Sequence, residues 1–219
     1  NYLCVHSFNK FYQLTLFAFF APLRSNKTVQ DTSCRSDFNY PSLPKTKSMA
    51  LIKECRGKSP IHGNDCWFAE NATIVGDVTM GDQCSVWFNA VIRGDVNSIT
   101  MGNKVNIQDG AVIHCTFEKT KTILGNNVSI GHNALVHGCT VEDNVLIGMG
   151  SIVMDDCYIE SGSIIAAGAV LKEGTRVEAG SIWAGVPAKK VKDISPELFE
   201  GEVMRIANNY VKYSGWFKD

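Results

Sequence analysis

The sequence predicts an all-β solenoid of hexapeptide repeats, followed by a C-terminal α-helix. Two observations carry this prediction. Apolar residues recur at every sixth position over much of the chain, and the spacing near the C-terminus changes to that of a helix. A period of six fits neither an α-helix, whose apolar residues recur every three or four positions, nor a simple alternating strand. Repetition at a fixed period is the sequence signature of a repeat architecture.

The clearest run of the repeat begins at position 141. Every sixth residue is apolar, and a small or β-branched residue follows four positions later. The large residues are Val141, Ile147, Val153, Ile159, Ile165, Leu171, Val177 and Trp183, and the small ones are Val145, Ser151, Cys157, Ser163, Ala169, Thr175 and Ser181. Such a hexapeptide predicts a short strand and a turn, three of which close a triangular coil. The large side chain points inward, the small one fills the corner, and stacked coils bury one another's faces.

The same period runs upstream in three shorter series, with breaks between them. The series are Phe68, Ile74, Met80, Val86, Ile92, then Met101, Ile107, Ile113, then Leu124, Ile130, Val136. The steps from Ile92 to Met101 and from Ile113 to Leu124 are longer than six, and the step into Val141 is one residue short. We expect the extra residues to leave the solenoid as external loops, often at a binding face.

The remaining segments lie at the two ends. Residues 1–48 show no sustained period, and we interpret them as a disordered, non-domain extension, with a targeting segment as the alternative. The β-helix then occupies residues 49–194. Residues 195–219 contain the helix, because Ser195 is a favoured N-cap residue and proline follows it at the first helical position. We expect this helix over about 196–212, packed along one flank of the prism.

Composition excludes several classes of function. The chain has 219 residues, a net charge of −1 and 20% charged residues, which is typical of a soluble globular protein. No basic surface favours nucleic acid or an anionic membrane. The eight cysteines are scattered, without CxxC spacing, so we interpret them as reduced thiols of a cytoplasmic protein.

Three histidines fall at related positions of the repeat. When faces are counted with the insertions removed, Arg93, His114 and His137 each follow an inward residue of one face, on successive coils. Asp109 and His132 form a second column on an adjoining face. His114 and His137 can therefore be close neighbours, whereas His132 points elsewhere. A threefold ring of subunits would bring a second copy of the His132 column against the first pair.

Three neutral imidazoles with one open position form a hydrolytic zinc arrangement. We therefore predict that His114, His132 and His137 bind Zn²⁺, with Fe²⁺ or Co²⁺ as alternatives. Zinc lowers the pKa of its water to about 7, which supplies hydroxide at neutral pH. His62 lies before the regular coils and has no such partners, so we interpret it as structural.

Several segments resemble the gamma-class carbonic anhydrases and their bacterial hexapeptide relatives. They are Arg93-Gly94-Asp95, Asn106-Ile107-Gln108-Asp109-Gly110, Ile113-His114, the run from Ile130 to Gly138, and the run from Trp183 to Lys189. The resemblance spans about residues 52–195. It implies a left-handed parallel β-helix that forms a homotrimer, with zinc or iron at each subunit interface. The implied reaction is the reversible hydration of carbon dioxide to bicarbonate by metal-bound hydroxide.

The resemblance also implies roles for residues near the histidines. Arg93 and Asp109 would pair across the interface, and Asp95 would join the same polar cluster. Gln108 would orient the metal-bound water, and Asn106 would line the pocket. A purely structural role stays open: the three charged residues would then hold the trimer together, and Gln108 would support a turn.

The sequence departs from the family pattern where a proton relay is expected. Val96 stands in place of an acidic residue, and the loop after His114 carries only Glu118 as an acid, either as a proton shuttle or as a solvated charge. Cys115 and Cys139 flank the predicted ligands, and we interpret both as packing residues.

Three alternative functions stay open from the sequence. The same solenoid is used by hexapeptide-repeat acyltransferases, because fold does not settle function. A metal-dependent acyl-CoA thioesterase would share all three ligands. A non-catalytic trimeric assembly protein would use the metal only to stabilise the trimer.

Overall fold

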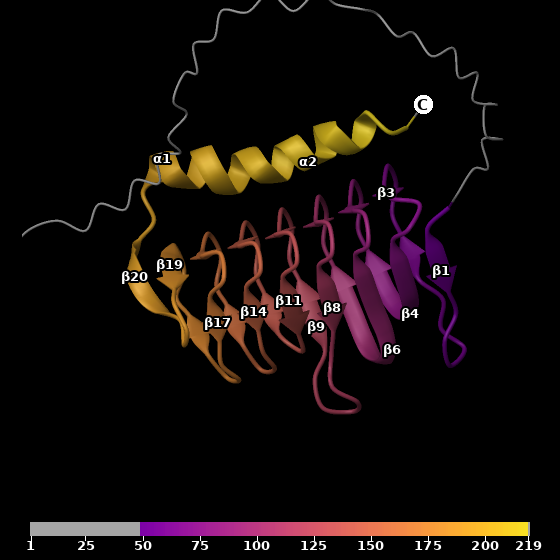
Figure 1. Ribbon diagram of the computed structural model, residues 1–219, viewed down its shortest axis with the longest axis horizontal. Helices are drawn as coiled ribbons and strands as arrows, with labels where there is room; N and C mark the ends of the chain where they lie inside the picture. The colour runs from indigo at the N-terminus through magenta and orange to yellow at the C-terminus, as the bar shows by residue number, and fades with distance from the viewer. Residues whose placement is uncertain (1–48, 219) are drawn as a thin grey trace, which may run out of the picture. The chain divides into compact units, whose positions relative to one another are not determined.

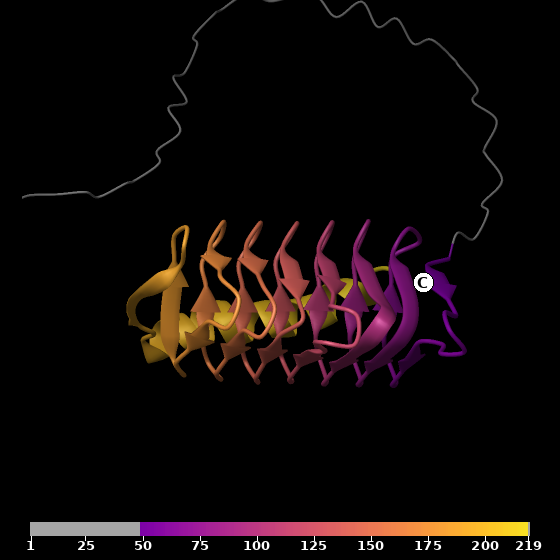
Figure 2. The same cartoon turned by 90° about the horizontal axis from the view of Figure 1, so that it is seen from below.

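The computed structural model describes residues 49–218, and these form the predicted parallel β-solenoid with a C-terminal helix (Figure 1). Short strands stack coil upon coil along the long axis of a prism (Figure 2). The predicted extension over residues 1–48 lies outside the described residues.

The strands form three faces, which we name A, B and C. Face A contains the first half of β6 (Val91–Met101), then β8 (Val112–His114), β11 (Leu135–His137), β14 (Ile152–Val153) and β17 (Val170–Leu171). Face B contains the second half of β6, then β9 (Thr122–Leu124), β12 (Thr140–Val141), β15 (Tyr158–Ile159) and β18 (Arg176–Val177). Faces A and B form one sheet, because β6 belongs to both. At the N-terminal end of this sheet, before β6, lie β1 (Leu51–Lys53), β2 (Ile61–His62) and β4 (Thr73–Met80).

Face C is a separate sheet. It contains β3 (Trp67–Phe68), β5 (Ser85–Val86), β7 (Asn106–Ile107), β10 (Ser129–Ile130), β13 (Leu146–Ile147), β16 (Ile164–Ile165), β19 (Ser181–Ala184) and β20 (Lys189–Asp193). All neighbours pair in parallel except β19 and β20, which form an antiparallel pair at the C-terminal end of the sheet.

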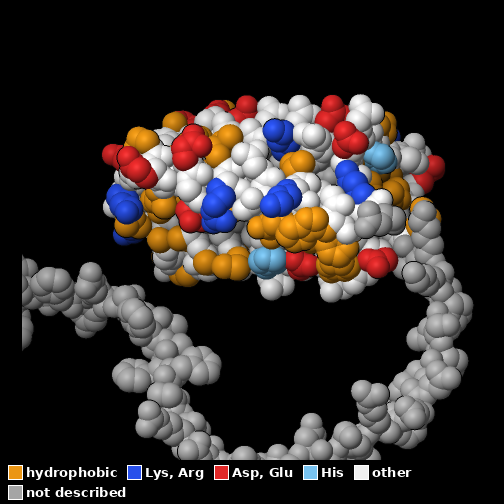
Figure 3. Space-filling view, turned by 90° about the horizontal axis from the view of Figure 1, so that it is seen from above, with side chains coloured by type: hydrophobic (Ala, Val, Ile, Leu, Met, Phe, Trp, Pro, Cys, Tyr) orange, Lys and Arg blue, Asp and Glu red, His pale blue; other side chains and the backbone are white. Residues whose placement is uncertain are grey.

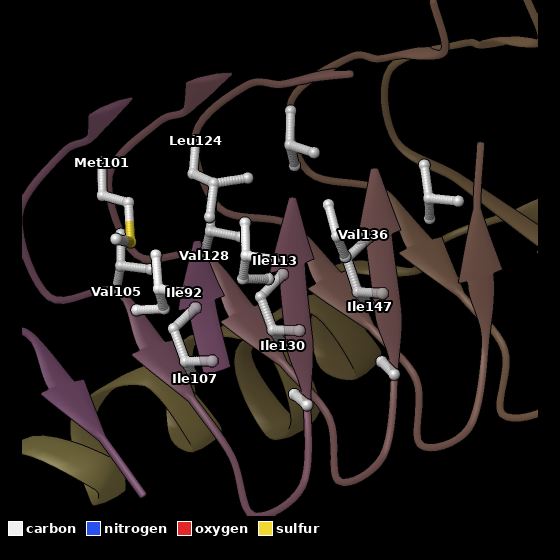
Figure 4. Close-up of a cluster of buried hydrophobic side chains, with 14 of the residues drawn as sticks. Ile92, Met101, Val105, Ile107, Ile113, Leu124, Val128, Ile130, Val136 and Ile147 are labelled. Carbon is white, nitrogen blue, oxygen red and sulfur yellow. The ribbon is translucent and has the colours of Figure 1, made fainter. Parts of the chain in front are cut away.

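The large residues of the repeat form one continuous core inside the prism (Figure 4). On face A, Ile92 pairs with Ile113, which pairs with Val136 on the next coil. On face C, Ile107 pairs with Ile130. These registers confirm the predicted count of faces. Each fully buried aliphatic side chain contributes about 1.5–3 kcal/mol relative to an exposed one. The stack of coils is therefore stabilised mainly by this buried apolar core.

Polar residues at the corners adopt the conformation that the turns require. Asn127 and Asn144 have positive φ angles of 54° and 59°, a left-handed conformation that asparagine tolerates better than most residues. Nδ2 of Asn127 also donates to Oδ1 of Asn144 at 2.9 Å. Successive corners are therefore connected by side-chain hydrogen bonds as well as by the backbone ladder.

The two long insertions behave differently. The extra residues between β8 and β9 leave the prism as an external loop over 115–121, as expected (Figure 1). The extra residues between Ile92 and Met101 do not form such a loop. Instead β6 continues around the corner, and its pairing with β4 shifts register between Gly76 and Val78. The expectation of an external loop was wrong there, because a bulged pair of long strands takes up the additional residues.

The C-terminal helix begins as predicted, with Oγ of Ser195 accepting from the amide of Leu198 at 3.3 Å. It then changes pitch, from α1 (Pro196–Leu198) through the π-helical η1 (Phe199–Met204) to α2 (Arg205–Gly215). The helix thus ends at Gly215, slightly beyond the predicted position. It runs along the prism (Figure 1), and Tyr210 packs edge-on against Trp87 at 5.1 Å between ring centroids.

The surface on the helix side mixes apolar side chains with charges of both signs (Figure 3). Trp216 and Phe217, at the end of the helix, are 63% and 50% exposed. None of the described helices is long and apolar enough to cross a membrane.

Candidate metal centre

His114 and His137 form a close pair at the ends of β8 and β11. Their backbones are paired in the parallel ladder, so the two side chains emerge from face A on adjacent coils. Nδ1 of His114 lies 3.1 Å from Nε2 of His137, and the rings meet edge-on with centroids 5.1 Å apart. Burial lowers the pKa of His114, and the positive charge of Arg93 lowers it further against the opposing effect of Asp95. His114 therefore favours the neutral imidazole that a metal ligand needs.

Asp95, which is paired with Arg93, contacts the ring nitrogen of His114 that faces away from His137. Nη1 of Arg93 donates to Oδ2 of Asp95 at 2.5 Å, and Oδ1 of the same carboxylate lies 3.1 Å from Nε2 of His114. Burial raises the pKa of Asp95, but the hydrogen bonds with Arg93 and His114 outweigh it and lower the pKa overall. The predicted cluster of Arg93 and Asp95 thus forms within one chain. Pairing of Arg93 with Asp109 stays a prediction about the assembly.

Asp155 holds His137 and was not predicted. Its Oδ1 lies 2.7 Å from Nδ1 of His137, which leaves Nε2 free to face His114. Thr116 and Thr120, in the loop after β8, donate their hydroxyl groups to the same carboxylate at 2.6 and 3.1 Å. A carboxylate on the far nitrogen of a ligating histidine fixes its tautomer and ring orientation.

His132 lies at the corner after β10, away from the pair. Its Nδ1 contacts Oδ2 of Asp109 at 2.9 Å, and its Nε2 lies 3.4 Å from the hydroxyl of Tyr210. The predicted second column of Asp109 and His132 is therefore present. The structure does not bring His132 to the pair, and among residues 49–218 no cluster of three or more metal-binding side chains exists in one subunit.

Asn106 and Gln108 are buried beside this corner. Nε2 of Gln108 donates to Oδ1 of Asn106 at 3.0 Å, and Nδ2 of Asn106 donates to Oγ of Ser129 at 2.7 Å. Gln108 and His132 also line a cavity of about 360 Å³ beneath the helix, whose other walls include Leu146, Met149, Ile164, Glu202 and Tyr210. Gln108 therefore places an amide at the edge of a mainly apolar cavity next to His132.

The remaining predicted residues lie outside this centre. Glu118 is exposed on the loop after β8 and lines a groove over face B. Val96 lines a different hollow, beside Cys55, Arg56 and Lys58. Cys115 and Cys139 are buried, and burial raises the pKa of both thiols, which supports their interpretation as packing residues. His62 is exposed and packs edge-on against Phe68.

The donor set and spacing of the pair suit a tetrahedral metal. Zinc binds imidazole nitrogen at about 2.0–2.1 Å, so two such nitrogens on one tetrahedral ion lie about 3.3 Å apart. The observed separation between the two nitrogens is 3.1 Å. The pair can therefore supply half of such a site, and further ligands must come from outside this cluster.

Comparisons with known proteins agree with the hexapeptide repeat. A family model described as bacterial transferase hexapeptide (six repeats) matches residues 59–94 and 138–173. A Methanocaldococcus jannaschii protein named "Probable carbonic anhydrase" is 55% identical over 145 residues, covering 66% of this chain and 88% of that protein.

Two further relatives extend the comparison. The mitochondrial gamma carbonic anhydrase 2 of Arabidopsis thaliana is 38% identical over 162 residues, which cover 70% of this chain and 57% of that protein. The crystal structure of a hexapeptide transferase family protein from Anaplasma phagocytophilum superposes with a TM-score of 0.73 at 39% identity, covering 76% of this chain and 98% of that one.

Proposed function

We propose that this chain, which belongs to the gamma carbonic anhydrase family of hexapeptide-repeat proteins, hydrates carbon dioxide reversibly at a metal held between subunits. One observation carries the proposal. His114 and His137 present two nitrogens at ligand spacing, while His132 lies on another corner of the same prism. Relatives named as carbonic anhydrases support the same reaction class.

The metal would be held by three histidines from two subunits. His114 and His137 of one subunit would supply two nitrogens, and His132 of a neighbour would supply the third. Zinc, when bound, would act as a Lewis acid that brings the pKa of a coordinated water to about 7. Closed threefold symmetry makes all such sites equivalent.

The other residues would keep the ligands in position and supply polar contacts. Asp155 would orient His137 by accepting from Nδ1, and Asp109 would do the same for His132. Gln108 would direct its amide at the reacting water from the edge of the cavity. The apolar walls around Gln108 suit carbon dioxide, which is apolar and carries no charge to be desolvated.

Exposed apolar side chains support an interface beside the pair. Ile152, on β14 of face A, is 36% exposed, and Met149 and Met154 on either side of it are 57% and 43% exposed. Contiguous exposed apolar surface of this kind marks interaction sites in soluble proteins. We assign its partner as a second copy of the chain, because that copy would also carry His132 to the pair.

The test combines metal analysis, oligomeric state and a hydration assay. The wild-type chain is expected to form a trimer with about one zinc per subunit and to hydrate carbon dioxide. His132→Ala should lose metal and activity together, while His62→Ala, which changes a histidine outside the site, should keep both. A wild-type trimer without stoichiometric metal would contradict the proposal.

Acyl transfer is the second candidate, favoured by the structural similarity to a hexapeptide transferase family protein. The same preparation, assayed with acetyl-CoA and amine acceptors, separates the two functions. Acetyl transfer that survives His132→Ala, without hydration of carbon dioxide by the wild type, would favour the transferase.

A further inference from the structure

We propose that Cys66 and Cys84 form an oxidisable dithiol, which hydroperoxides convert into a disulfide that connects two coils of face C. This site lies at the N-terminal end of the prism, and its argument does not depend on the metal centre.

The parallel ladder stacks the two cysteines directly. Trp67 pairs with Ser85, so the preceding residues, Cys66 and Cys84, occupy equivalent positions on adjacent coils. The amide of Trp67 donates to the carbonyl oxygen of Cys84 at 2.9 Å. Adjacent strands lie about 4.7–4.9 Å apart, which falls within the Cα separation of about 4.4–6.8 Å that disulfides require. The backbone spacing therefore allows a disulfide, for which each thiol leaves its present acceptor, the carbonyl oxygen of Gly81 for Cys66 and that of Gly102 for Cys84.

The two thiols differ in exposure and in acidity. Cys84 is buried, whereas Cys66 is half-buried and can be reached from solvent. The hydrogen bond with Cys84 lowers the pKa of Cys66 well below its usual value. This hydrogen bond outweighs burial, which raises the pKa of Cys66. Nearby His62 lowers the pKa of Cys66 further, and Asp82 raises it. The pKa of Cys84 is raised by the same hydrogen bond and by burial. Because the thiolate is the nucleophile, Cys66 is the sulfur that reacts first and Cys84 is the sulfur that resolves.

A second stacked pair in the chain provides a natural comparison. Thr140 pairs with Tyr158, so Cys139 and Cys157 are also neighbours on adjacent coils, on face B. Both are only 2% exposed, and burial raises the pKa of both thiols. The backbone spacing is equivalent, but neither sulfur is an accessible thiolate. The two pairs therefore have the same backbone proximity but differ in the solvent accessibility and ionisation of their thiols, so comparing them shows whether proximity alone is enough for oxidation.

The reaction has two balanced steps. The Cys66 thiolate attacks one peroxide oxygen, so that an S–O bond forms, the O–O bond breaks, and the leaving hydroxide (or alkoxide) takes up a proton. Cys66 is now a sulfenic acid, and the peroxide is reduced. The sulfur of Cys84 then attacks the sulfur of Cys66, so that the S–S bond forms and the S–O bond breaks. The departing hydroxide takes up the proton of the Cys84 thiol as water, and a thiol reductant reverses the change.

The experiment uses the full chain with Cys4, Cys34 and Cys55 replaced by serine, which leaves both stacked pairs and Cys115. The folded protein is treated with a small excess of hydrogen peroxide, remaining thiols are alkylated after denaturation, and peptides are identified by mass spectrometry. The expected product is a Cys66–Cys84 disulfide that dithiothreitol removes, while Cys139 and Cys157 remain fully alkylated.

Two single variants distinguish the roles of the sulfurs. Cys84→Ser should stop the reaction at a Cys66 sulfenic acid, which dimedone traps. Cys66→Ser should leave Cys84 unoxidised. Circular dichroism confirms that each variant keeps the wild-type fold, and should serine unfold one, alanine replaces it. Cys66 that stays reduced in the folded chain, or a Cys139–Cys157 disulfide formed to the same extent, would overturn the proposal.

Discussion

The orientation of His137 depends on a residue that lies one coil away. Asp155 accepts from Nδ1 of His137 at 2.7 Å and is itself held by the hydroxyl groups of Thr116 and Thr120. Gly138 makes this possible, because a side chain there would collide with both Asp155 and Thr120. The carboxylate therefore connects the His114–His137 pair to the external loop.

Asp155→Asn should weaken metal binding while leaving the fold intact. Loss of the charged partner of a ligating histidine typically reduces metal affinity about 10–100-fold. Competition with a chromophoric chelator measures the affinity, and thermal unfolding without metal checks the fold. Asp156→Asn, on the neighbouring exposed residue, is the matched control and should bind as the wild type does. Equal metal affinities for the two variants would show that Asp155 does not position His137 for the metal.

The sequence pattern located the histidines together with Asp95 and Asp109, which contact His114 and His132, but it did not reveal Asp155 or Tyr210. The two columns followed from counting in sixes, because register in a solenoid repeats from coil to coil. Asp155 lies two residues after Val153, which pairs with Val136, and a count of faces does not show that its side chain contacts His137. Tyr210 approaches His132 from the helix, whose docking position no local pattern specifies.

Within the stack of coils, Gly148 after β13 of face C lies where the backbones of adjacent coils approach closely. A Cβ atom on Gly148 would lie 2.5 Å from the amide nitrogen of Ala167 and 2.6 Å from the carbonyl carbon of Ala166. These are backbone atoms, so the clash cannot be relieved by rotating a side chain.

Gly148→Ala should therefore destabilise the folded chain by about 1–3 kcal/mol, the usual cost of overpacking. Gly215→Ala, at the end of α2, meets no atom within 4 Å and should be neutral or slightly stabilising, because alanine favours the helix. Denaturant unfolding of both variants measures the free energy of unfolding. A Gly148→Ala chain as stable as the wild type would show that the coils can separate locally.

Glu142 connects two coils of face B and makes their stability depend on pH. Its carboxylate accepts from the hydroxyl of Tyr158 at 2.5 Å and from the amide and hydroxyl of Ser161 at 3.0 and 2.9 Å. The hydrogen bond from Tyr158 and those from Ser161 lower the pKa of Glu142, against a small opposing effect of burial.

A lowered pKa in the folded state means that the unfolded chain binds more protons between the two pKa values, so stability rises with pH there. The contribution of Glu142 is present above its ordinary pKa of about 4.3 and is lost as the pH falls through the folded value. Glu142→Gln should flatten the acid limb of the stability curve, whereas Glu118→Gln on the exposed loop should not. Denaturant unfolding across that pH range measures both, and parallel acid limbs for wild type and Glu142→Gln would contradict this assignment.

The fold of the repeat was predictable because few architectures are compatible with an apolar period of six residues. The external loop between β8 and β9 was also predicted. The unbroken β6 was not, because an insertion of three residues fits either a loop or a bulged strand pair, and the choice depends on β4 beside it. The π-helical turn over Phe199–Met204 has no counterpart in a pattern of apolar spacing.

At the scale of the whole molecule, the proposed metal site requires subunits to share their histidines. One described chain separates His132 from the His114–His137 pair, each with its own carboxylate. Each subunit would therefore give two ligands to one metal and the third to another, so that assembly and metal binding are coupled. Removal of the metal should weaken the trimer, and dilution of the trimer should release the metal.

Mixing two inactive variants tests this claim most directly. His132→Ala and His137→Ala subunits are each expected to bind no stoichiometric metal alone, because every site lacks one ligand. In a mixed threefold ring, one interface joins an intact His114–His137 pair to an intact His132, so co-refolded chains should recover about one metal per mixed trimer, together with hydration of carbon dioxide. Mixed trimers that recover no metal, or a His132→Ala trimer that keeps full metal by itself, would contradict a site shared between subunits.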